Sequence, residues 1–560
     1  MRRLTFCTLL FATACPVASA PPDDDDAADD DDATDDDDAT DDDDATDDDD
    51  ATDDDDAAGL RSALYPEDWT PEFEDAEGRF LHDFSYAGYF KGEEPLPLGI
   101  EGVTASVLDF GADAEGSTDS TAAFQAAVDS LPQGGIVHVP EGTYRLDGTL
   151  RVAADGVVIR GDGSDLSRLW FATAAGMSDR GHIQFQGAVT RGEHMLLAQD
   201  GAARSRTVLL DPADEVEVGD EVAIGWVITE AFVAEHEMTD TWQAFNGTWR
   251  PFFRRTVTEV EGSTVTLDVP LRYPALVRDQ ASLRVEAGYL RGVGIEEVGL
   301  STAGTRVDAL SVDRTHAVRM EGVADGWIAR VESFRSPQSE DDRHLLSGGV
   351  AVVDSKRVTV ADSVLAYAQN RGGGGNGYLF EVSRSSEVLF RDCVGIAGRH
   401  NFIQNWDFGT SGTVWLRTTS REGFAASTDN ESLGLVGLSE YHHSLAMANL
   451  VDDSVADDGW GAVNRQGWSS GAGHSATQSV FWNLRGEGIL RSYQFGHGYV
   501  IGTGAEIDVQ AEKGGAWDLF GLGEGTAPSD WVEHQGNAPL LAPQSLYEDQ
   551  LSRRLAAPPG

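Results

Sequence analysis

The hydrophobic pattern between Val107 and Phe171 changes its period from helical to extended. It starts with apolar residues three and four positions apart, which predict a short helix, and a Pro-Gln-Gly-Gly stop ends that helix. Short apolar runs separated by tight turns follow, and they predict strands. Strands this short cannot bury a core alone, so each must stack on the next coil of a solenoid, whose open end the helix covers. The helical face consists of Phe124, Ala127, Val128 and Leu131, and the strands are Ile136–Val139 and the segments around Tyr144 and Val157–Ile159.

A coil rhythm of the same kind returns after Leu290. Similar apolar stretches begin roughly 26 to 31 residues apart, which suits one solenoid turn plus a variable loop. Coils stack about 4.8 Å apart, so equivalent positions form ladders along the stack. On this spacing Asn370–Arg371 and His400–Asn401 are expected side by side on adjacent coils. The stretches begin at Val298, Trp327, Val358, Val388, Val414 and Leu445.

Bulky aromatic residues interrupt the rhythm between 207 and 288 and predict an inserted β subdomain. Two interpretations of these aromatics remain open. They form the core of the subdomain, or they form an exposed platform on which sugar rings stack, with Trp242 and Trp249 as candidates. The lead-in before the first coils is expected along the outside of those coils. A short helix after Pro543 is expected to close the C-terminal end.

The order of signals in Val107–Phe171 resembles the N-terminal pectate-lyase-like domain of rhamnogalacturonases, some exo-glucanases, certain epimerases and phage tailspikes. The resemblance implies an all-β, single-stranded right-handed parallel β-helix with an N-terminal capping helix, here with an inserted β subdomain. It does not fix the reaction, because the family uses one scaffold for several chemistries and some members are not enzymes. The predicted parts are a signal peptide (1–20), a tether (21–58), a lead-in (59–106), N-terminal coils (107–206), the inserted subdomain (207–288), coils with the groove (289–542) and a cap or tail (543–560).

Composition supports a folded, turn-rich β chain, since 560 residues include 63 glycines and 41% hydrophobic residues. The net charge is −56, and 24 of the negative charges lie in the aspartate run Asp23–Ala58, which predicts an extended, disordered spacer. The rest of the chain is still acidic. This argues against nucleic acid as a partner, and against polyuronate substrates unless the groove is locally basic or holds a cation.

The first residues form a targeting segment. Arg2 and Arg3 precede an apolar run that is too short to span a bilayer. Cleavage at a lipobox-like sequence makes Cys15 the lipidated first residue, and cleavage after Ala20 is the alternative. The expected location is the extracellular or outer-membrane surface, as a lipid-anchored lipoprotein or, alternatively, freely secreted. Cys393 lies outside this region and is expected to be a buried apolar residue.

The richest polar cluster begins at Arg399, and two chemistries suit it. β-Elimination beside a uronate needs a base for the C5 proton and a cationic group for the carboxylate. His400 or His443 is the candidate base, Arg399 or Arg465 the candidate clamp, and Asn401 a neutralising partner. Hydrolysis instead needs two carboxyl groups about 5 Å or about 6.5–9.5 Å apart. The carboxyl candidates are Asp407, Glu422, Asp453 and Asp458.

Each of these residues also has a structural interpretation, such as an asparagine ladder inside a turn or a histidine that caps a carbonyl group. The cluster as a whole is harder to explain by surface polarity. The candidate catalytic residues are Arg399, His400, Asn401, Asp407, His443, Arg465 and His474, and the candidate substrate-binding residues are Asn370, Arg371, Asn376, Trp242, Trp249, Trp460 and Tyr493.

The sequence therefore predicts an extracellular enzyme that degrades a polysaccharide, with lyase chemistry placed before glycoside hydrolysis because of the resemblance. The alternative is a non-catalytic β-helix that binds glycan or mediates adhesion. No cofactor is fixed by the sequence, although acidic pairs could bind Ca²⁺. The expected partner is the polysaccharide, with no nucleic acid and with membrane contact through the lipid anchor alone. The chain is expected to be a monomer, with a trimer as the alternative for this fold.

Overall fold

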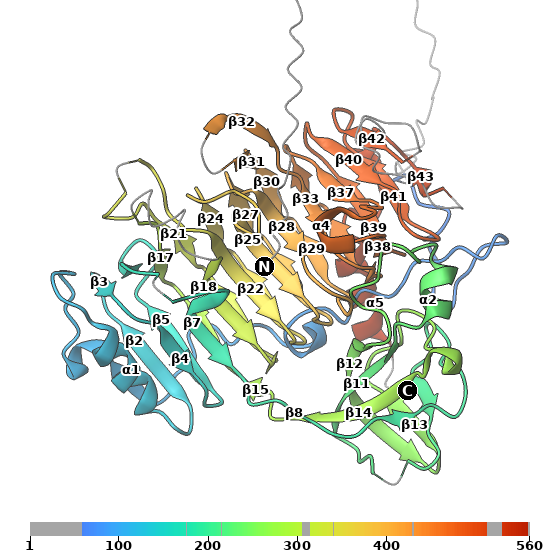
Figure 1. The fold of residues 1–560 in the computed structure, drawn as a ribbon, viewed down its shortest axis with the longest axis horizontal. Helices are drawn as coiled ribbons and strands as arrows, with labels where there is room; N and C mark the ends of the chain where they lie inside the picture. The colour runs from blue at the N-terminus through green and yellow to red at the C-terminus, as the bar shows by residue number, and fades with distance from the viewer. Residues whose placement is uncertain are drawn as a thin grey trace, which may run out of the picture. The chain divides into compact units, whose positions relative to one another are not determined.

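The computed structural model describes residues 59–557, except 175, 214, 305–313, 340, 428–429 and 512–528. The predicted signal peptide, Cys15 and the aspartate tether lie outside the described residues. Within the described ranges, no helix is both long enough and apolar enough to cross a membrane. Short strands lie side by side from coil to coil (Figure 1), so the predicted parallel β-helix is confirmed.

Three parallel sheets form the walls of the β-helix, counted over the described residues. The twelve-stranded sheet contains β1 (Thr104–Ser106), β2 (Gly135–Val139), β5 (Val157–Gly161), β16 (Gly294–Glu296), β20 (Trp327–Ala329), β23 (Thr359–Ala361), β26 (Leu389–Arg391), β29 (Val414–Leu416), β35 (Leu450–Asp452), β39 (Val480–Leu484), β41 (Tyr499–Thr503) and β43 (Trp531–Glu533). The eight-stranded sheet contains β3 (Gly142–Leu146), β6 (Ser167–Phe171), β17 (Gly299–Ser301), β21 (Glu332–Ser333), β24 (Val364–Ala366), β27 (Val394–Ile396), β30 (Thr419–Arg421) and β36 (Val455–Ala456).

The third wall is the ten-stranded sheet, which carries the site described below. It contains β4 (Leu150–Val152), β7 (Arg180–Gln186), β18 (Thr315–Glu321), β22 (Gly348–Val353), β25 (Tyr378–Ser383), β28 (His400–Gln404), β33 (Ser439–Tyr441), β37 (Trp460–Ala462), β40 (Ile489–Ser492) and β42 (Asp508–Gln510). The remaining short elements outside the inserted sheet and the longer helices are β15 (Leu290–Arg291), β19 (Val323–Ala324), β31 (Phe424–Ser427), β32 (Asn430–Val436), β34 (Ala446–Met447), β38 (Ala476–Thr477), α4 (Trp468–Gly471) and the 3₁₀ helices Tyr89–Gly92, Val107–Phe110, Val277–Asp279 and Ala538–Leu540.

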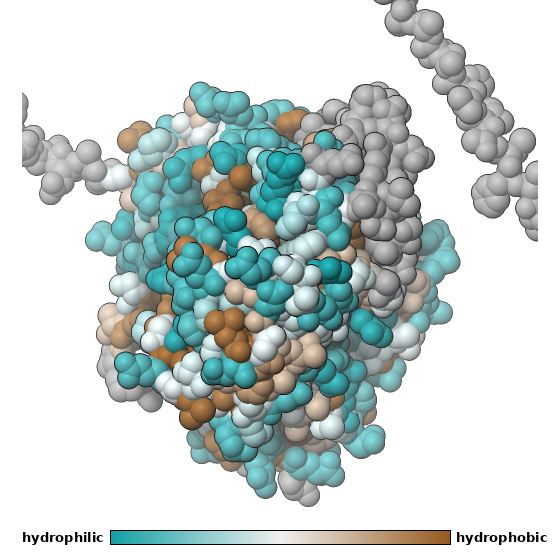
Figure 2. All heavy atoms as spheres, turned by 90° about the vertical axis from the view of Figure 1, so that its left-hand side faces the viewer, coloured by the Kyte–Doolittle hydropathy of each residue, from teal (hydrophilic) through white to brown (hydrophobic). Residues whose placement is uncertain are grey.

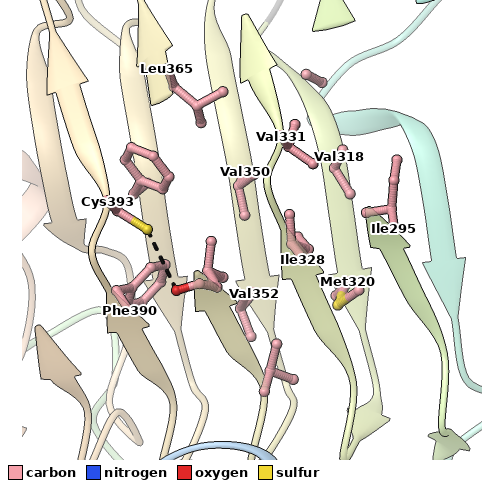
Figure 3. Packing of buried hydrophobic residues seen from close by; sticks show 14 of the residues in the cluster. Ile295, Val318, Met320, Ile328, Val331, Val350, Val352, Leu365, Phe390 and Cys393 are labelled. Atoms are coloured by element: carbon pink, nitrogen blue, oxygen red, sulfur yellow. Dashed lines mark hydrogen bonds between the residues drawn. The ribbon is translucent and has the colours of Figure 1, made fainter. Parts of the chain in front are cut away.

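Alternate side chains of each strand point into the β-helix and stack there on their equivalents in the next coil. Ile295, Ile328 and Phe390 occupy such interior positions in the twelve-stranded sheet (Figure 3). Cys393 joins the same core, where its thiol donates to the Val360 carbonyl oxygen at 3.5 Å. Burial raises the pKa of Cys393 to about 12, so the thiol is an inert core group, in agreement with the prediction.

The predicted capping helix is present as α1 (Thr121–Asp129). Phe124, Ala127 and Val128 are buried in the same core as the first strands, and α1 lies beyond β2 at the end of the stack (Figure 1). Seen from this end, the surface is largely hydrophilic with scattered apolar residues (Figure 2). The helix therefore covers apolar strand edges that water would otherwise reach.

The inserted subdomain is an antiparallel sheet with its own core. It begins earlier than the predicted residue 207, because β8 and β9 both pair with β14. Trp226 and Phe252 stack at 3.7 Å between ring centroids inside it, which favours the core interpretation of the aromatic residues. The elements are β8 (Thr190–Arg191), β9 (Met195–Leu196), β10 (Thr207–Leu209), β11 (Glu221–Val227), α2 (Glu230–Glu235), β12 (Trp249–Glu261), β13 (Thr264–Leu267) and β14 (Ser282–Ala287).

The lead-in and the C-terminal helix α5 (Leu546–Ala556) lie together on the outer face of the twelve-stranded sheet. The lead-in starts beside the last coils, where Leu60 pairs with Leu541, and reaches the first coils where Arg160 binds the Ile100 carbonyl. Both placements correct the sequence expectations, since the lead-in covers late coils as well and α5 covers a side, not the end. The reason is that this sheet is apolar on both faces, so its outer side also needs a cover.

Candidate functional site

A cleft of about 900 Å³ lies over the ten-stranded sheet, across β18, β22, β25, β28 and β33. Strand ends and the loops that follow them supply its lining. Four arginines but a single carboxylate side chain appear among the described lining residues, so the cleft is locally basic within an acidic chain. The charged and aromatic lining residues are Asp179, Arg314, Arg319, Arg384, Arg399, His442, His443, Tyr378 and Trp406.

A ladder of outward-facing residues lies beneath the residues that line the cleft. Glu381 pairs in register with Ile403, and Ile403 pairs with Glu440 on the next strand. The residues on either side of each glutamate in its strand point into the core or its margin, which leaves the glutamate on the outer face. At about 4.8 Å per strand, the two glutamate backbones are roughly 9–10 Å apart.

Glu440 is the centre of the first polar group under the cleft. Its Oε2 accepts from Arg465 Nη1 at 2.7 Å, and its Oε1 lies against His442 Nδ1 and 3.3 Å from His400 Nε2. Burial alone would raise the pKa of Glu440, but the Arg465 guanidinium and the hydrogen bond from His442 outweigh it, and the pKa is well below its usual value. Glu440 is therefore a buried carboxylate ion.

His442 directly follows β33, and its backbone N–H donates to the Gln404 carbonyl at 2.9 Å, which extends the strand ladder. Two positions after Glu440, its side chain therefore lies on the same face. A carboxylate can only accept, so His442 Nδ1 carries the proton and Nε2 keeps its lone pair. Burial, assisted by Arg465, lowers the pKa of His442 to about 3. The imidazole that lines the cleft is thus a neutral base.

His400, at the start of β28, has the opposite tautomer. Its Nδ1 donates to the Leu438 carbonyl, which leaves an Nε2 that is buried without a hydrogen-bond partner and faces Glu440. Burial lowers the pKa of His400 to about 4. Donor atoms of His400, Glu440 and His442 all lie within 4.8 Å of one another, so these three residues have the composition and the spacing to hold a metal ion.

A second polar group lies at the other end of the cleft. Arg314 bridges Asp179 and Glu381, with Nε 2.8 Å from Asp179 Oδ1 and Nη1 3.2 Å from Glu381 Oε1. Asn405 also donates to Glu381, at 2.9 Å. Burial would raise the pKa of Asp179, but His316 and Arg314 outweigh it and lower the pKa. The carboxylates at this end are therefore fully engaged by cationic and amide donors.

Arg399 stands apart from the other arginines of the cleft. Its Nη1 donates to the Gly372 carbonyl at 2.6 Å, whereas its Nε is buried without a hydrogen-bond partner. In the part of the chain that the structure describes, no carboxylate forms an ion pair with it. Its positive charge is thus available to an anionic group that enters the cleft.

The structure brings six of the predicted residues together at the cleft. Asn370, Asn376, Arg399 and His443 line it, while His400 and Arg465 contact Glu440 beneath it. His443 uses both ring nitrogens, since Nε2 contacts the Ser469 carbonyl and Nδ1 the Ser444 hydroxyl. Its neighbour His442 is the better-placed base.

The remaining catalytic candidates have structural partners away from the cleft lining. Asn401 donates to Asp458 at 2.8 Å inside the coil. Asp407 pairs with Arg250 at 2.9 Å, and burial raises its pKa. His474 Nε2 contacts the His236 carbonyl at 3.1 Å, at the junction with the inserted subdomain.

The predicted sugar-binding aromatics are also placed elsewhere. Trp460 and Trp242 are fully buried in the two cores and have no surface to offer a sugar ring. Trp249 donates to Ser282 within the subdomain, at 2.8 Å. Tyr493 is buried beside β40, and Arg371 stacks on the Phe424 ring at 3.5 Å. Neither of the last two lines the cleft.

The expected register between neighbouring coils is wrong at this point. His400 pairs with Tyr378, and does not stand beside Asn370. The glycine-rich loop Gly372–Gly377 lengthens the connection from β24 to β25, whereas β27 and β28 are joined by a short turn. Counting from the strand starts therefore misses the shift.

The acidic pairs proposed for hydrolysis or calcium do not converge on the cleft. Asp452 accepts from the backbone N–H of Tyr547 at 2.8 Å and so caps α5. Asp453 pairs with Arg485 at 2.5 Å, and Asp458 accepts from Ser420 at 2.6 Å. Glu422 is exposed at a turn and does not line the cleft.

Sequence reasoning missed Glu381, Glu440, His442 and Trp406. The first two have a signal in the sequence, because each is a glutamate inside a short strand whose neighbours face the core. Trp406 is 44% exposed and its ring lies 4.3 Å from that of His443. Trp406 thus provides an exposed aromatic surface at the cleft, whereas the sequence analysis had considered such a surface in the inserted subdomain.

The comparison with protein families agrees with the fold. Residues 104–202 match the family model described as Rhamnogalacturonase A/epimerase, pectate lyase-like, which spans the N-terminal coils. The resemblance seen in the sequence is thereby confirmed for this segment. No curated protein matches the chain significantly.

Solved β-helical structures are similar at low identity. They include the tailspike protein gp49 from Pseudomonas phage LKA1 (13% identity, TM-score 0.37, 72% of this chain and 76% of that chain) and the A-module of the mannuronan C-5 epimerase AlgE4 from Azotobacter vinelandii (12%, 0.30, 77% and 95%). The Gp54 tailspike of Acinetobacter baumannii bacteriophage AP22, solved with a capsular saccharide, is another (9%, 0.29, 79% and 80%). These similarities concern architecture alone.

Proposed function

We propose that the protein is a polysaccharide lyase that cleaves an acidic glycan by β-elimination in the cleft over the ten-stranded sheet. The observation that carries this proposal is Arg399, an arginine without a carboxylate partner in the described part of a chain whose net charge is −56. An uncompensated guanidinium in a cleft is suited to a carboxylate of the substrate. The acidic net charge of the chain disfavours polyuronate substrates unless the groove is locally basic, and the lining of this cleft is locally basic.

The reaction uses His442 as the base and Arg399 as the clamp. Arg399 binds the uronate carboxylate and stabilises the negative charge that develops on it as C5 is deprotonated. His442 Nε2 takes the C5 proton, and Glu440 stabilises the imidazolium through Nδ1. The electron pair of the C5–H bond forms a C4–C5 double bond, the C4–O bond breaks, and water protonates the departing oxygen. The product carries a new unsaturated end.

Hydrolysis is the second candidate, and the ladder Glu381–Ile403–Glu440 is the observation that favours it. Backbones roughly 9–10 Å apart on one face of a sheet can bring two carboxyl groups to the separation of about 6.5–9.5 Å that an inverting hydrolase uses. Both carboxylates are covered, however, Glu381 by Arg314 and Glu440 by the histidines. A non-catalytic glycan-binding role would use the same cleft without turnover.

We further propose that the protein acts outside the cytoplasm, attached through lipidated Cys15 and the aspartate spacer. This part rests on the sequence of residues 1–58 alone. The acidic spacer suits this role, because like charges keep such a segment extended.

The test is an incubation of the full chain with a panel of acidic and neutral polysaccharides, followed by ultraviolet absorbance of the unsaturated product and by a reducing-end assay. Arg399→Gln is expected to lower kcat/KM on an acidic glycan about 10- to 100-fold, the value of a hydrogen bond to a charged group. Arg330→Gln is the matched control, because Arg330 pairs with Glu297 on an exposed turn. It should leave turnover unchanged.

New reducing ends without ultraviolet absorbance would favour hydrolysis over β-elimination, with Glu381 and Glu440 as the catalytic carboxyl groups. Binding without either signal would leave the glycan-binding role. Equal loss of activity in Arg399→Gln and in the control would contradict the assignment of the cleft.

A further inference from the structure

We propose that His400, Glu440 and His442 form a binding site for a first-row divalent transition-metal ion such as Zn²⁺. The site consists of His400 Nε2, Glu440 Oε1 and His442 Nδ1, which lie within 4.8 Å of one another under the floor of the cleft. Two imidazoles and a carboxylate are a donor set that suits zinc and its neighbours in the first transition row, not calcium or magnesium.

The hydrogen bonds of His400 carry the argument. The Leu438 carbonyl can only accept, so Nδ1 must donate to it. In the neutral ring, Nε2 then presents a lone pair to Glu440 Oε1 at 3.3 Å, with no hydrogen between the two atoms. Two buried acceptors that face each other repel unless a cation lies between them. A carbonyl group on the far nitrogen is also the arrangement that orients metal-binding histidines.

The distances fit an ion of this size. Metal–ligand bonds of about 2.0–2.2 Å in a tetrahedral site place two ligand atoms about 3.4 Å apart, close to the 3.3 Å between His400 and Glu440. His442 Nδ1 lies nearer to Glu440 than that, so its ring moves slightly outward, into the cleft that it lines, when the ion enters. Arg465 holds the other carboxylate oxygen at 2.7 Å and fixes its orientation. Of the three residues, His442 is the one that lines the cleft.

Metal binding affects the reaction proposed above. A metal ion on His442 Nδ1 forces the ring proton onto Nε2, which then cannot accept the C5 proton. Zn²⁺ is therefore expected to inhibit turnover. This consequence rests on the proposed function, whereas binding of the ion does not.

The experiment titrates the chelator-treated full chain with Co²⁺ and with Zn²⁺, without any glycan. Cobalt bound by imidazole nitrogen in a site of low coordination number absorbs visible light far more strongly than the aqua ion. This signal separates the site from weak oxygen ligation by the aspartate run. We expect one strongly absorbing Co²⁺ per chain, displaced by Zn²⁺ in calorimetric titration, and binding weakened more than about tenfold in His442→Ala and in Glu440→Gln.

One control and the choice of test variant make the result decisive. His138→Asn alters another histidine that contacts a carboxylate, Asp162, at 2.8 Å, but without a third ligand, and it should bind Co²⁺ like the parent chain. His442→Ala lies at the cleft surface and leaves the contact between His400 and Leu438 intact, so a folded variant is obtainable. Failure of the parent chain to develop the absorption, or an unchanged spectrum in both His442→Ala and Glu440→Gln, would overturn the site.

The two proposals fail separately. Cobalt binding without turnover of any glycan would contradict the lyase proposal and support the metal site. Turnover by a chain that binds no cobalt would support the lyase proposal and contradict the metal site.

Discussion

Three buried aspartates accept hydrogen bonds from neutral groups. Asp452 caps α5, Asp458 accepts from Ser420 and Asn401, and Asp530 accepts from Ser492 and from the backbone of Gln494. Burial outweighs these hydrogen bonds and raises the pKa to about 7, 6 and 7, respectively. At neutral pH these groups are therefore near their titration midpoints.

These aspartates predict how stability depends on pH. Their pKa values are higher in the folded state than in the unfolded chain, so between about pH 4 and 7 the folded state binds more protons. Each of these groups should therefore contribute a decrease in the free energy of unfolding as pH rises from 5 to 8, of the order of 1 kcal/mol or more. The buried histidines, whose pKa values are lowered, act in the opposite direction below about pH 6.5, so the contribution of an aspartate is measured against a variant that lacks it. Chemical denaturation at several pH values measures this slope.

In Asp530→Asn the free energy of unfolding should fall less, or rise more, between pH 5 and 8 than in the parent chain, because the amide does not titrate. Asp109→Asn, at an exposed position near the N-terminal cap, should leave the pH dependence of the parent chain unchanged. A free energy of unfolding that depends on pH in the same way in Asp530→Asn and in the parent chain would contradict this assignment.

At the residue scale, the sequence located the neighbourhood of the site but not its working groups. His400, Arg399 and Arg465 were recognised as unusual polar residues, and all three lie at or under the cleft. The sequence did not show that His400 faces outward whereas Asn401 faces the interior. Adjacent residues of a strand point to opposite faces, and the sequence alone did not indicate which face is outward. The register shift at the glycine loop hid the pairing with Tyr378.

Among the elements, the inserted subdomain is fastened to the coils by a buried ionic group. Glu387 follows β25 and accepts from Arg272 at 2.7 Å, and Arg255 lies 3.3 Å from it. All three side chains are almost completely buried. Burial lowers the pKa of Arg255 to about 10, against the opposing effect of Glu387.

Glu387→Gln is expected to destabilise the protein strongly, because it leaves two buried guanidinium groups without their carboxylate. Removal of one member of a buried ion pair costs about 3–5 kcal/mol. Glu297→Gln breaks the exposed pair with Arg330 and should cost less than about 1 kcal/mol. Denaturant unfolding of both variants gives the comparison, and equal losses would contradict the proposed importance of burial.

The prediction of elements succeeded where one residue pattern determined one structure. The capping helix was recognisable because its four apolar residues lie on one face and a clear stop follows. The segments that cover the outer face of the twelve-stranded sheet were not recognisable from the sequence. Runs such as Val414–Leu416, apolar at every position, indicate that both faces are buried, but they do not say which segment lies outside.

Over the whole folded part, the lead-in connects distant coils. Tyr65 packs on Trp482 in the late coils, while Tyr89 packs on Trp327 in the early ones. A linear stack of repeats can unfold from its ends, because each coil contacts only its neighbours. The lead-in adds contacts across many coils, so the stack should unfold as one cooperative unit.

Removal of the lead-in tests this cooperativity. A chain that begins at Gly59 should melt in a single transition, whereas a chain that begins at Glu101 exposes the outer apolar face around Val480 and Ile501 and should melt in several steps or aggregate. Calorimetry together with light scattering distinguishes these outcomes. Identical single transitions for both chains would contradict the role of the lead-in.

The same contact between Leu60 and Leu541 also fixes an order of events during synthesis. The ribosome delivers the lead-in first, yet its docking surface is completed only when the last coils and α5 have emerged. For most of translation the segment must therefore remain undocked, with its tyrosines and tryptophan in water. The fold is completed only after the final tens of residues have been synthesised. A nascent chain stalled before them would expose the apolar outer face of the twelve-stranded sheet.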